Sequence, residues 1–81
     1  MVTITDVQTM LEKMVKALVE SGGEVVISPI EGDNTVVFEV QVNSEDTGKV
    51  IGKKGRTINA LRTILRSTKV PGDKKLMMEL V

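Results

Sequence analysis

Cysteine and histidine are both absent from this chain of 81 residues. Their absence removes disulfides, thiol chemistry, Cys/His metal sites and imidazole acid–base catalysis together. The four serines have no histidine or cysteine to activate them, and no acidic residues cluster with the spacing of metal ligands. The sequence therefore predicts a protein that is not an enzyme and that needs no cofactor.

Aromatic residues and long apolar runs are scarce as well. Phe38 is the only aromatic residue, whereas 41% of the chain is hydrophobic. That content argues against disorder, so we expect a core of aliphatic side chains around Phe38. Charged residues interrupt the first 20 positions, which excludes a signal peptide or a membrane span there. We expect one domain over residues 1–81, in the cytoplasm and without a membrane partner.

The formal net charge is zero, but the charges are divided unequally along the chain. Residues 1–46 carry two basic and nine acidic side chains, for a net charge of −7, and residues 47–81 carry nine basic and two acidic side chains, for +7. This division indicates a polyanion-binding half beside a half that repels polyanions. An ordinary solvated surface explains charge counts alone about as well.

A first helix is predicted over residues 6–20, because seven apolar residues follow the i, i+3, i+4, i+7 spacing. They are Val7, Met10, Leu11, Met14, Val15, Leu18 and Val19. Thr5 and Gln8 fit a capping box at its start, and Gly22 and Gly23 end it.

Two strands are expected next. Residues 24–30 form the first, which Pro29 assigns to an edge or a strand end. Residues 31–34 have the composition of a turn. Residues 35–42 alternate in polarity with Phe38 on the apolar side, so one face of this strand is expected to be covered.

The remaining residues predict two helices and a strand. Ser44 is the expected N-cap of a short helix that runs to about Ile51, with Glu45 and Asp46 near its positive end. A second helix is expected over residues 56–68, a loop over 70–75 and a strand over 76–81. The second helix should place Ile58, Leu61, Ile64 and Leu65 inward and Arg62, Arg66 and Lys69 outward.

This order, α-β-β-α-α-β, predicts an α+β fold. The first two strands share a short turn and should pair antiparallel, whereas two helices separate the second strand from the third, which favours a parallel, right-handed crossover. We expect a three-stranded mixed sheet with three helices on one face and residues 35–42 as its central strand.

Two glycines and two lysines, Gly52-Lys53-Lys54-Gly55, separate the two helices of the second half. Glycine tolerates positive φ and has no side chain to hold a ligand away, so this loop can lie against a phosphodiester chain. Lys53 and Lys54 supply charge without base selectivity, and the start of the following helix adds a partial positive charge. Aliphatic residues flank the loop as a surface for bases: Val50, Ile51 and Ile58.

The run VIGKKGRTI, residues 50–58, resembles the I-G-x-x-G-x-x-I signature of KH domains, and the element order resembles their type II arrangement. Nearly the whole chain is similar to the small bacterial single-KH proteins of the KhpA family, most closely over residues 43–65. The resemblance implies a cleft that binds about four nucleotides of single-stranded RNA, with low sequence specificity, in an RNA chaperone or post-transcriptional regulator.

The resemblance also implies the site and the partners. The RNA-binding residues would be Gly52, Lys53, Lys54, Gly55, Lys49, Arg56, Ile51, Val50, Ile58 and Arg62. The edge of the central strand would form the opposite wall, and residues 69–75 a variable loop beside the cleft. Implied partners are a second copy of the chain, in a homodimer, and a larger KH-containing protein of the KhpB/Jag type.

Plainer alternatives exist for the same residues. Gly52 and Gly55 fit an ordinary tight turn, Lys53 and Lys54 a solvated loop tip, and the outward basic residues of the last helix a soluble face. The lack of tryptophan and tyrosine disfavours modules that stack bases on a sheet, which need aromatic platforms. The main alternative function is a protein-interaction subunit that dimerises or serves a larger KH-containing partner and binds RNA only weakly.

Overall fold

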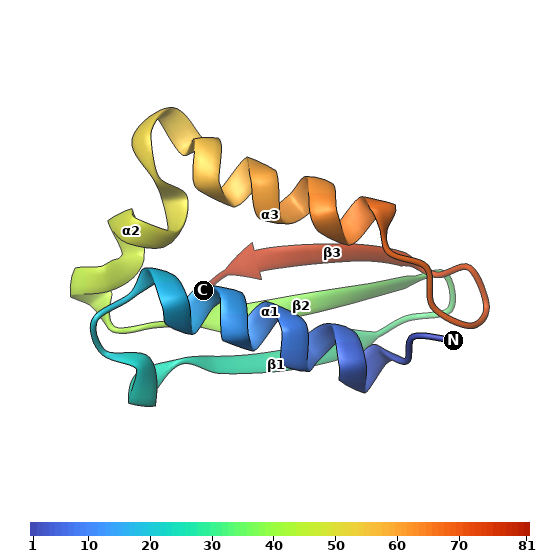
Figure 1. The fold of residues 1–81 in the computed structure, drawn as a ribbon. Helices are drawn as coiled ribbons and strands as arrows, with labels where there is room; N and C mark the ends of the chain where they lie inside the picture. Colours follow the sequence, from blue (N-terminus) through green and yellow to red (C-terminus); the bar gives the residue numbers. More distant parts are fainter.

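A computed structural model describes all of residues 1–81 and has three helices and three strands (Figure 1). The elements are α1 (Ile4–Leu18), β1 (Val26–Glu31), β2 (Thr35–Gln41), α2 (Thr47–Ile51), α3 (Arg56–Ser67) and β3 (Lys75–Leu80). Short 3-10 turns cover Gly22–Glu24, Ser44–Asp46 and Lys53–Gly55. The predicted order of elements is confirmed, with bounds that differ by one or two residues.

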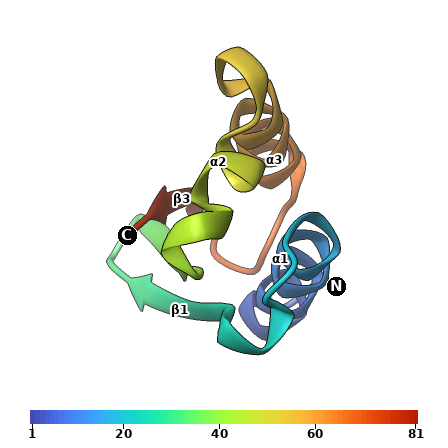
Figure 2. The same ribbon diagram turned by 90° about the vertical axis from the view of Figure 1, so that its left-hand side faces the viewer.

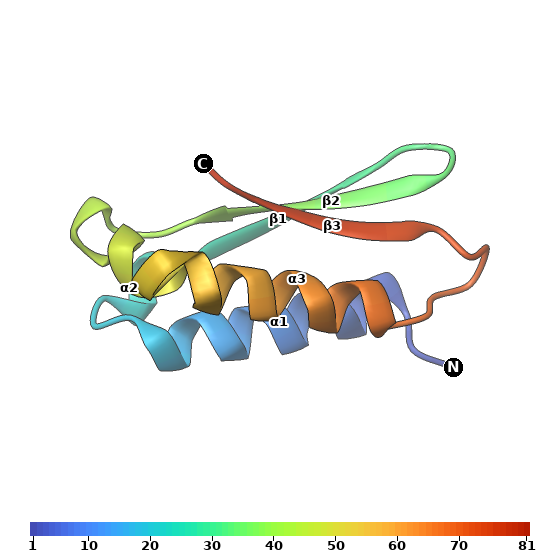
Figure 3. The same cartoon turned by 90° about the horizontal axis from the view of Figure 1, so that it is seen from above.

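The sheet has the order β1-β2-β3, with β1 antiparallel and β3 parallel to β2. The predicted pairing and the central position of β2 are therefore confirmed. Figure 3 shows the helices on one side of the sheet and none on the other. The strand alternation explains this one-sided cover, because Val36, Phe38 and Val40 all point to the helices and are fully buried.

The first helix begins earlier than predicted. Thr3, not Thr5, is its N-cap: the Asp6 amide donates to Thr3 Oγ1 at 3.1 Å, and the Thr3 amide donates to Asp6 Oδ2 at 3.0 Å. Both pairs of residues have capping-box spacing, and the earlier pair allows Ile4 to pack against the core. The predicted capping residue Gln8 instead donates through Nε2 to the Ile27 carbonyl, 3.0 Å away, and ties α1 to β1. The helix also ends before the glycines, at Leu18.

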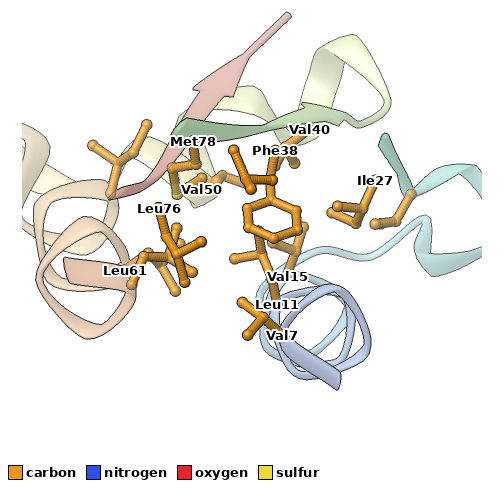
Figure 4. Packing of buried hydrophobic residues seen from close by; sticks show 14 of the residues in the cluster. Val7, Leu11, Val15, Ile27, Phe38, Val40, Val50, Leu61, Leu76 and Met78 are labelled. Carbon is orange, nitrogen blue, oxygen red and sulfur yellow. The ribbon is translucent and has the colours of Figure 1, made fainter. Parts of the chain in front are cut away.

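The core is aliphatic around Phe38, as predicted. Phe38 projects from β2 toward Leu11 and Val15 of α1 (Figure 4), and all three are fully buried. From α3, Ile58, Leu61 and Leu65 enter the core. Ile64 does not: it is 41% exposed, so its predicted inward position is wrong. Three residues spaced i, i+3, i+7 fill the inner face of α3, and Ile64, directly before the last of them, is turned about a quarter of the helix circumference away from that face.

One carboxylate lies inside the structure. Asp46 is only 2% exposed and accepts hydrogen bonds from the amides of Glu20 and Ser21, at 3.4 and 3.1 Å. It thereby links the end of α1 to the start of α2. The predicted N-cap role of Ser44 is wrong, because the side chain of Asn43 caps this turn by accepting from the Glu45 amide. Asp46 faces inward and is not a free charge at the helix start.

Candidate nucleic-acid interface

The loop between α2 and α3 has an unusual backbone. Three of its four residues have positive φ: Gly52 at 76°, Lys54 at 58° and Gly55 at 74°. A lysine in the left-handed region costs on the order of 1 kcal/mol, so the surrounding structure must hold it there. The Gly52 amide donates to the Gly48 carbonyl at 2.8 Å, and the Gly55 amide donates to the Gly52 carbonyl at 3.2 Å. These bonds fix a tight loop of defined shape.

The two glycines are constrained differently. A Cβ on Gly52 would lie 2.2 Å from Thr57 Oγ1 and 3.0 Å from the Thr57 amide nitrogen. A Cβ on Gly55 would meet only Asn59 Nδ2, at an ordinary 3.6 Å. Gly52 is therefore required by both its φ and its surroundings, whereas Gly55 is required by its φ alone.

The tip of the loop carries free positive charge. Lys53, Lys54 and Arg56 are exposed, and their side chains make no ion pair or hydrogen bond. No side chain caps the start of α3 either. Figure 2 shows this loop at one end of the molecule, standing away from the sheet. Three cations and a helix start thus face solvent together, and this arrangement attracts anions.

A groove runs between α3 and β3 from this end of the molecule to the loop before β3. Three hollows make it up, counted from the α2 end. The first and second adjoin because both are lined by Arg62, and the second and third adjoin because both are lined by Arg66. The hollow nearest α2 is lined by Thr47, Ile51, Ile58, Arg62, Glu79, Leu80 and Val81. It combines aliphatic surface with one guanidinium, from Arg62, and one carboxylate, from Glu79, and it is open to solvent.

Three predicted site residues, Ile51, Ile58 and Arg62, come together in this hollow. Ile51 is 38% exposed, but Ile58 is only 7% exposed and offers little of its surface. The two isoleucines form the helix-side wall of the groove, as the sequence predicts. Arg62 lies on the exposed side of α3 beside them.

Two other predicted site residues do not reach the groove. Val50 is fully buried, because in a helix of five residues it is the one that turns toward the core, so it supports the wall from behind. Lys49 lies near the end of α1, where its Nζ is 3.1 Å from Asp46 Oδ1 and 3.2 Å from Glu20 Oε1. Its charge is already paired. Neither Val50 nor Lys49 lines the groove, and their contact with RNA stays a prediction.

The opposite wall also differs from the prediction. The groove is lined by Leu80 and its neighbours on β3, not by the central strand β2. The reason is topological: the crossover places β3 at the sheet edge beside α3, so β3 lies between the groove and β2.

Sequence reasoning missed several residues of the groove. Thr47, Leu80 and Val81 line its first hollow, and Arg66 and Lys75 line the two farther ones. The spacing of Arg62 and Arg66, one turn apart on the exposed side of α3, was a usable signal for the basic residues. The strand residues had no such signal, because their place depends on the sheet order.

Two pKa shifts reflect the contact between α1 and α2. The Ser21 amide, followed by Lys49 and the Glu20 amide, holds the pKa of the Asp46 carboxyl below its usual value. The Asp46 and Glu20 carboxylates raise the pKa of the Lys49 ammonium. Both groups are therefore charged at neutral pH, and they fasten the helix that precedes the glycine loop.

An α+β fold of order α-β-β-α-α-β, with a G-x-x-G loop joining its second and third helices, defines a KH domain of type II. A sequence model of the family described as KhpA/KhpB, KH domain, matches residues 8–80. The chain belongs to this family. Its family membership makes it a non-catalytic protein, as the lack of cysteine and histidine predicts.

Similar proteins are known from several bacteria, each named RNA-binding protein KhpA. The one from Clostridium acetobutylicum is 38% identical over 72 residues, which cover 89% of this chain and 96% of that protein. The one from Chlamydia trachomatis is 41% identical over 88% of this chain and 91% of its own length. The one from Oceanobacillus iheyensis is 35% identical over 91% and 99%. No solved structure matches this chain significantly.

Neither a membrane span nor a metal cluster is found. None of the three helices has the length and apolar character that crossing a bilayer requires. No group of three or more acidic side chains is arranged to hold a metal ion.

Proposed function

We propose that residues 1–81 act as one RNA-binding domain in the cytoplasm and bind single-stranded RNA. The observation that carries this proposal is the Gly52–Gly55 loop, held in a left-handed conformation with Lys53 and Lys54 unpaired at its tip. A loop of this shape lets a phosphate chain approach the backbone closely, since neither glycine carries a Cβ. The relatives named as RNA-binding proteins support it.

The groove suits the unpaired bases of a single strand better than the paired bases of a double helix. Ile51 and Ile58 give an aliphatic wall on the helix side, and Leu80 gives one on the strand side. Unstacked bases rest on such surfaces, whereas paired bases are hidden inside a helix. About four nucleotides would bind between the loop and the strand, with Arg56 and Arg62 adding charge. Because no aromatic platform is available, we expect weak binding with little sequence preference, which suits an RNA chaperone or a post-transcriptional regulator.

The test is fluorescence anisotropy of a labelled single-stranded RNA pool. Lys53→Asp combined with Lys54→Asp should weaken binding at least about tenfold, because it reverses the charge that faces the phosphates. Lys13→Asp with Lys16→Asp is the matched control: it makes the same change of charge on α1, outside the groove, and should weaken binding much less. For four neutralised phosphates, wild-type affinity should fall with salt with a logarithmic slope of about −3. Equal losses in both double variants would contradict the proposed site.

A second function, subunit pairing, is favoured by a different observation. The side of the sheet without helices exposes Val26, Ile30 and Met77, each by 40% or more. Weak RNA-binding modules gain from pairing, since linking two raises avidity by about 10²–10⁴. We therefore propose a homodimer, and, as a further partner, a larger KH-containing protein of the KhpB/Jag type. Sedimentation velocity over a wide range of concentration tests the homodimer.

A further inference from the structure

The two sides of the groove beside the glycine loop carry opposite charges. Arg62 lies on the α3 side of the hollow nearest α2, and Glu79 lies on the β3 side of the same hollow. The two lysines of the loop and Arg56 adjoin the α3 side, because α3 begins at Arg56. Glu79 is the only acidic side chain that lines this hollow. The groove is therefore positive along the helix and the loop and negative at the end of the strand.

The carboxylate of Glu79 has no partner within the chain. Glu79 is exposed, and each of the four ion pairs of the structure joins other residues, with Arg62 in none of them. Its neighbour across the sheet is Glu39 of β2, a like charge, and like charges in this position destabilise a sheet. Glu79 therefore adds no stability by ion pairing, and its carboxylate is free to accept hydrogen bonds from a ligand.

These charges determine which part of a bound strand faces which side of the groove. The phosphates of a single strand are attracted to the α3 side and repelled by Glu79. The bases then point across the hollow toward β3, over the aliphatic surface of Ile51 and Leu80. The Watson–Crick edges of unpaired bases are open to hydrogen bonding. The edge of a base, and not a phosphate, thus comes to the Glu79 carboxylate.

We infer that Glu79 is a specificity-determining residue, whose carboxylate selects a base with an exocyclic amino group over uracil at the end of β3. An ionised carboxylate only accepts hydrogen bonds. Cytosine, adenine and guanine each carry an amino group that donates, whereas uracil carries none and presents carbonyl oxygens instead. The N3–H of uracil lies between two of these oxygens, which a carboxylate repels. The inference deepens the function proposed above and rests on it: most of the strand is bound without regard to sequence, and one base is selected.

Repulsion alone would have a different effect. A carboxylate that only repels phosphates lowers the affinity for every RNA equally, whatever its bases. Glu39 provides the comparison, because it lies directly beside Glu79 on the neighbouring strand, about 4.8 Å away, but does not line the hollow. Replacing either carboxylate by an amide removes the same charge from nearly the same place. Only a loss of base selection separates the two roles of Glu79.

The test is fluorescence anisotropy of labelled hexacytidine and hexauridine, titrated with the wild type, Glu79→Gln and Glu39→Gln. The wild type should bind hexacytidine about fivefold more tightly, which corresponds to one hydrogen bond at a solvent-exposed site. Glu79→Gln should bring the two affinities to within about twofold of each other, because an amide both donates and accepts. Glu39→Gln should keep the wild-type ratio. Both variants should fold, since each removes a repulsion between like charges, and thermal melts verify this.

Each other outcome overturns the inference. Equal affinity of the wild type for the two hexamers, or tighter binding of hexauridine, would mean that no amino group is selected. A preference for hexacytidine that survives in Glu79→Gln, or that is lost equally in Glu39→Gln, would assign the selection to other groups. A gain in affinity for both hexamers at an unchanged ratio would show that Glu79 acts by repulsion alone. Binding of neither hexamer by the wild type would overturn the proposed function as well, whereas binding without selection overturns this inference only.

Discussion

The two long helices lie side by side on the same face of the sheet, yet they begin in opposite ways. At the start of α1, Thr3 and Asp6 satisfy each other's amides in a capping box. At the start of α3, Gly55 in the left-handed region offers no side-chain cap, and two unpaired lysines stand beside it. One helix start is closed and serves stability. The other is left open, and this difference supports the proposal that RNA binds at the loop end of the molecule.

Truncating the largest core side chain beneath the helices should cause the largest loss of stability. Phe38 is fully buried against α1, so Phe38→Ala should leave a cavity and lower the free energy of unfolding by about 3–5 kcal/mol. A domain of this size has on the order of 4–12 kcal/mol in total, and much of the variant should be unfolded. Urea denaturation followed by circular dichroism measures the change. A midpoint equal to that of the wild type would mean that Phe38 does not support the core.

The next largest effects should come from alanine substitution of the two glycines in the loop before α3, and the two losses of stability should differ. Gly52→Ala should lower the free energy of unfolding by about 2 kcal/mol or more and abolish RNA binding, because the added Cβ meets Thr57 in a strained backbone. Gly55→Ala should lower it by only about 1 kcal/mol, since space for the Cβ is available and only φ is strained. Thermal melts and RNA anisotropy of both variants measure this. Equal effects would show that crowding by Thr57 does not matter.

Removing the N-cap of α1 should lower the free energy of unfolding by about 1 kcal/mol. Thr3→Ala deletes the hydroxyl that accepts from the Asp6 amide. RNA affinity should not change, because α1 does not line the groove. Chemical denaturation and anisotropy on the same sample measure both. A change in affinity at unchanged stability would connect the closed end to ligand binding after all.

The smallest predicted effect concerns the link between α1 and α2, and it is a dependence of stability on pH that should be absent near neutral pH and appear in acid. The pKa of Asp46 is lowered in the folded state, so its stabilising contribution is present at neutral pH and is lost as the pH falls below about 4. The melting temperature should therefore fall over this range, and Asp46→Asn should fall less steeply. Asp6, whose pKa is lowered chiefly by the Thr3 amide, adds to the same trend in both proteins. Melting temperatures that fall in parallel with pH in the wild type and in Asp46→Asn would exclude Asp46 as the source of the acid dependence.

Periodic patterns explain which parts of this fold the sequence could predict. The alternation in residues 35–42 and the spacing in α1 and α3 are long enough to define a buried face, so Phe38 and the sheet order were predicted correctly. The five residues of α2 make little more than one turn, too few to separate Val50 in the core from Ile51 in the groove. The pairing of Lys49 depends on the end of α1, which is distant in sequence. A charge count cannot detect such a contact.

The candidate site was predicted best where its backbone is unusual. Glycines three apart at a helix break pointed to the loop directly, and its glycines do adopt positive φ. The strand wall was assigned to β2 because the sequence does not indicate which strand edge lies beside α3. Ile64 was placed inward by spacing that also fits a half-exposed position. Long-range packing, not local propensity, decided both.

The hydrogen bonds within the glycine loop bear on the thermodynamics of any complex. Because Gly48, Gly52 and Gly55 already hold the loop in shape, little of its conformational entropy remains to be lost when a ligand arrives. The ordering cost then falls on the flexible nucleic acid chain. Binding should release counterions and restrict the ligand. The backbone of the loop should keep its conformation, because it is preorganised for binding.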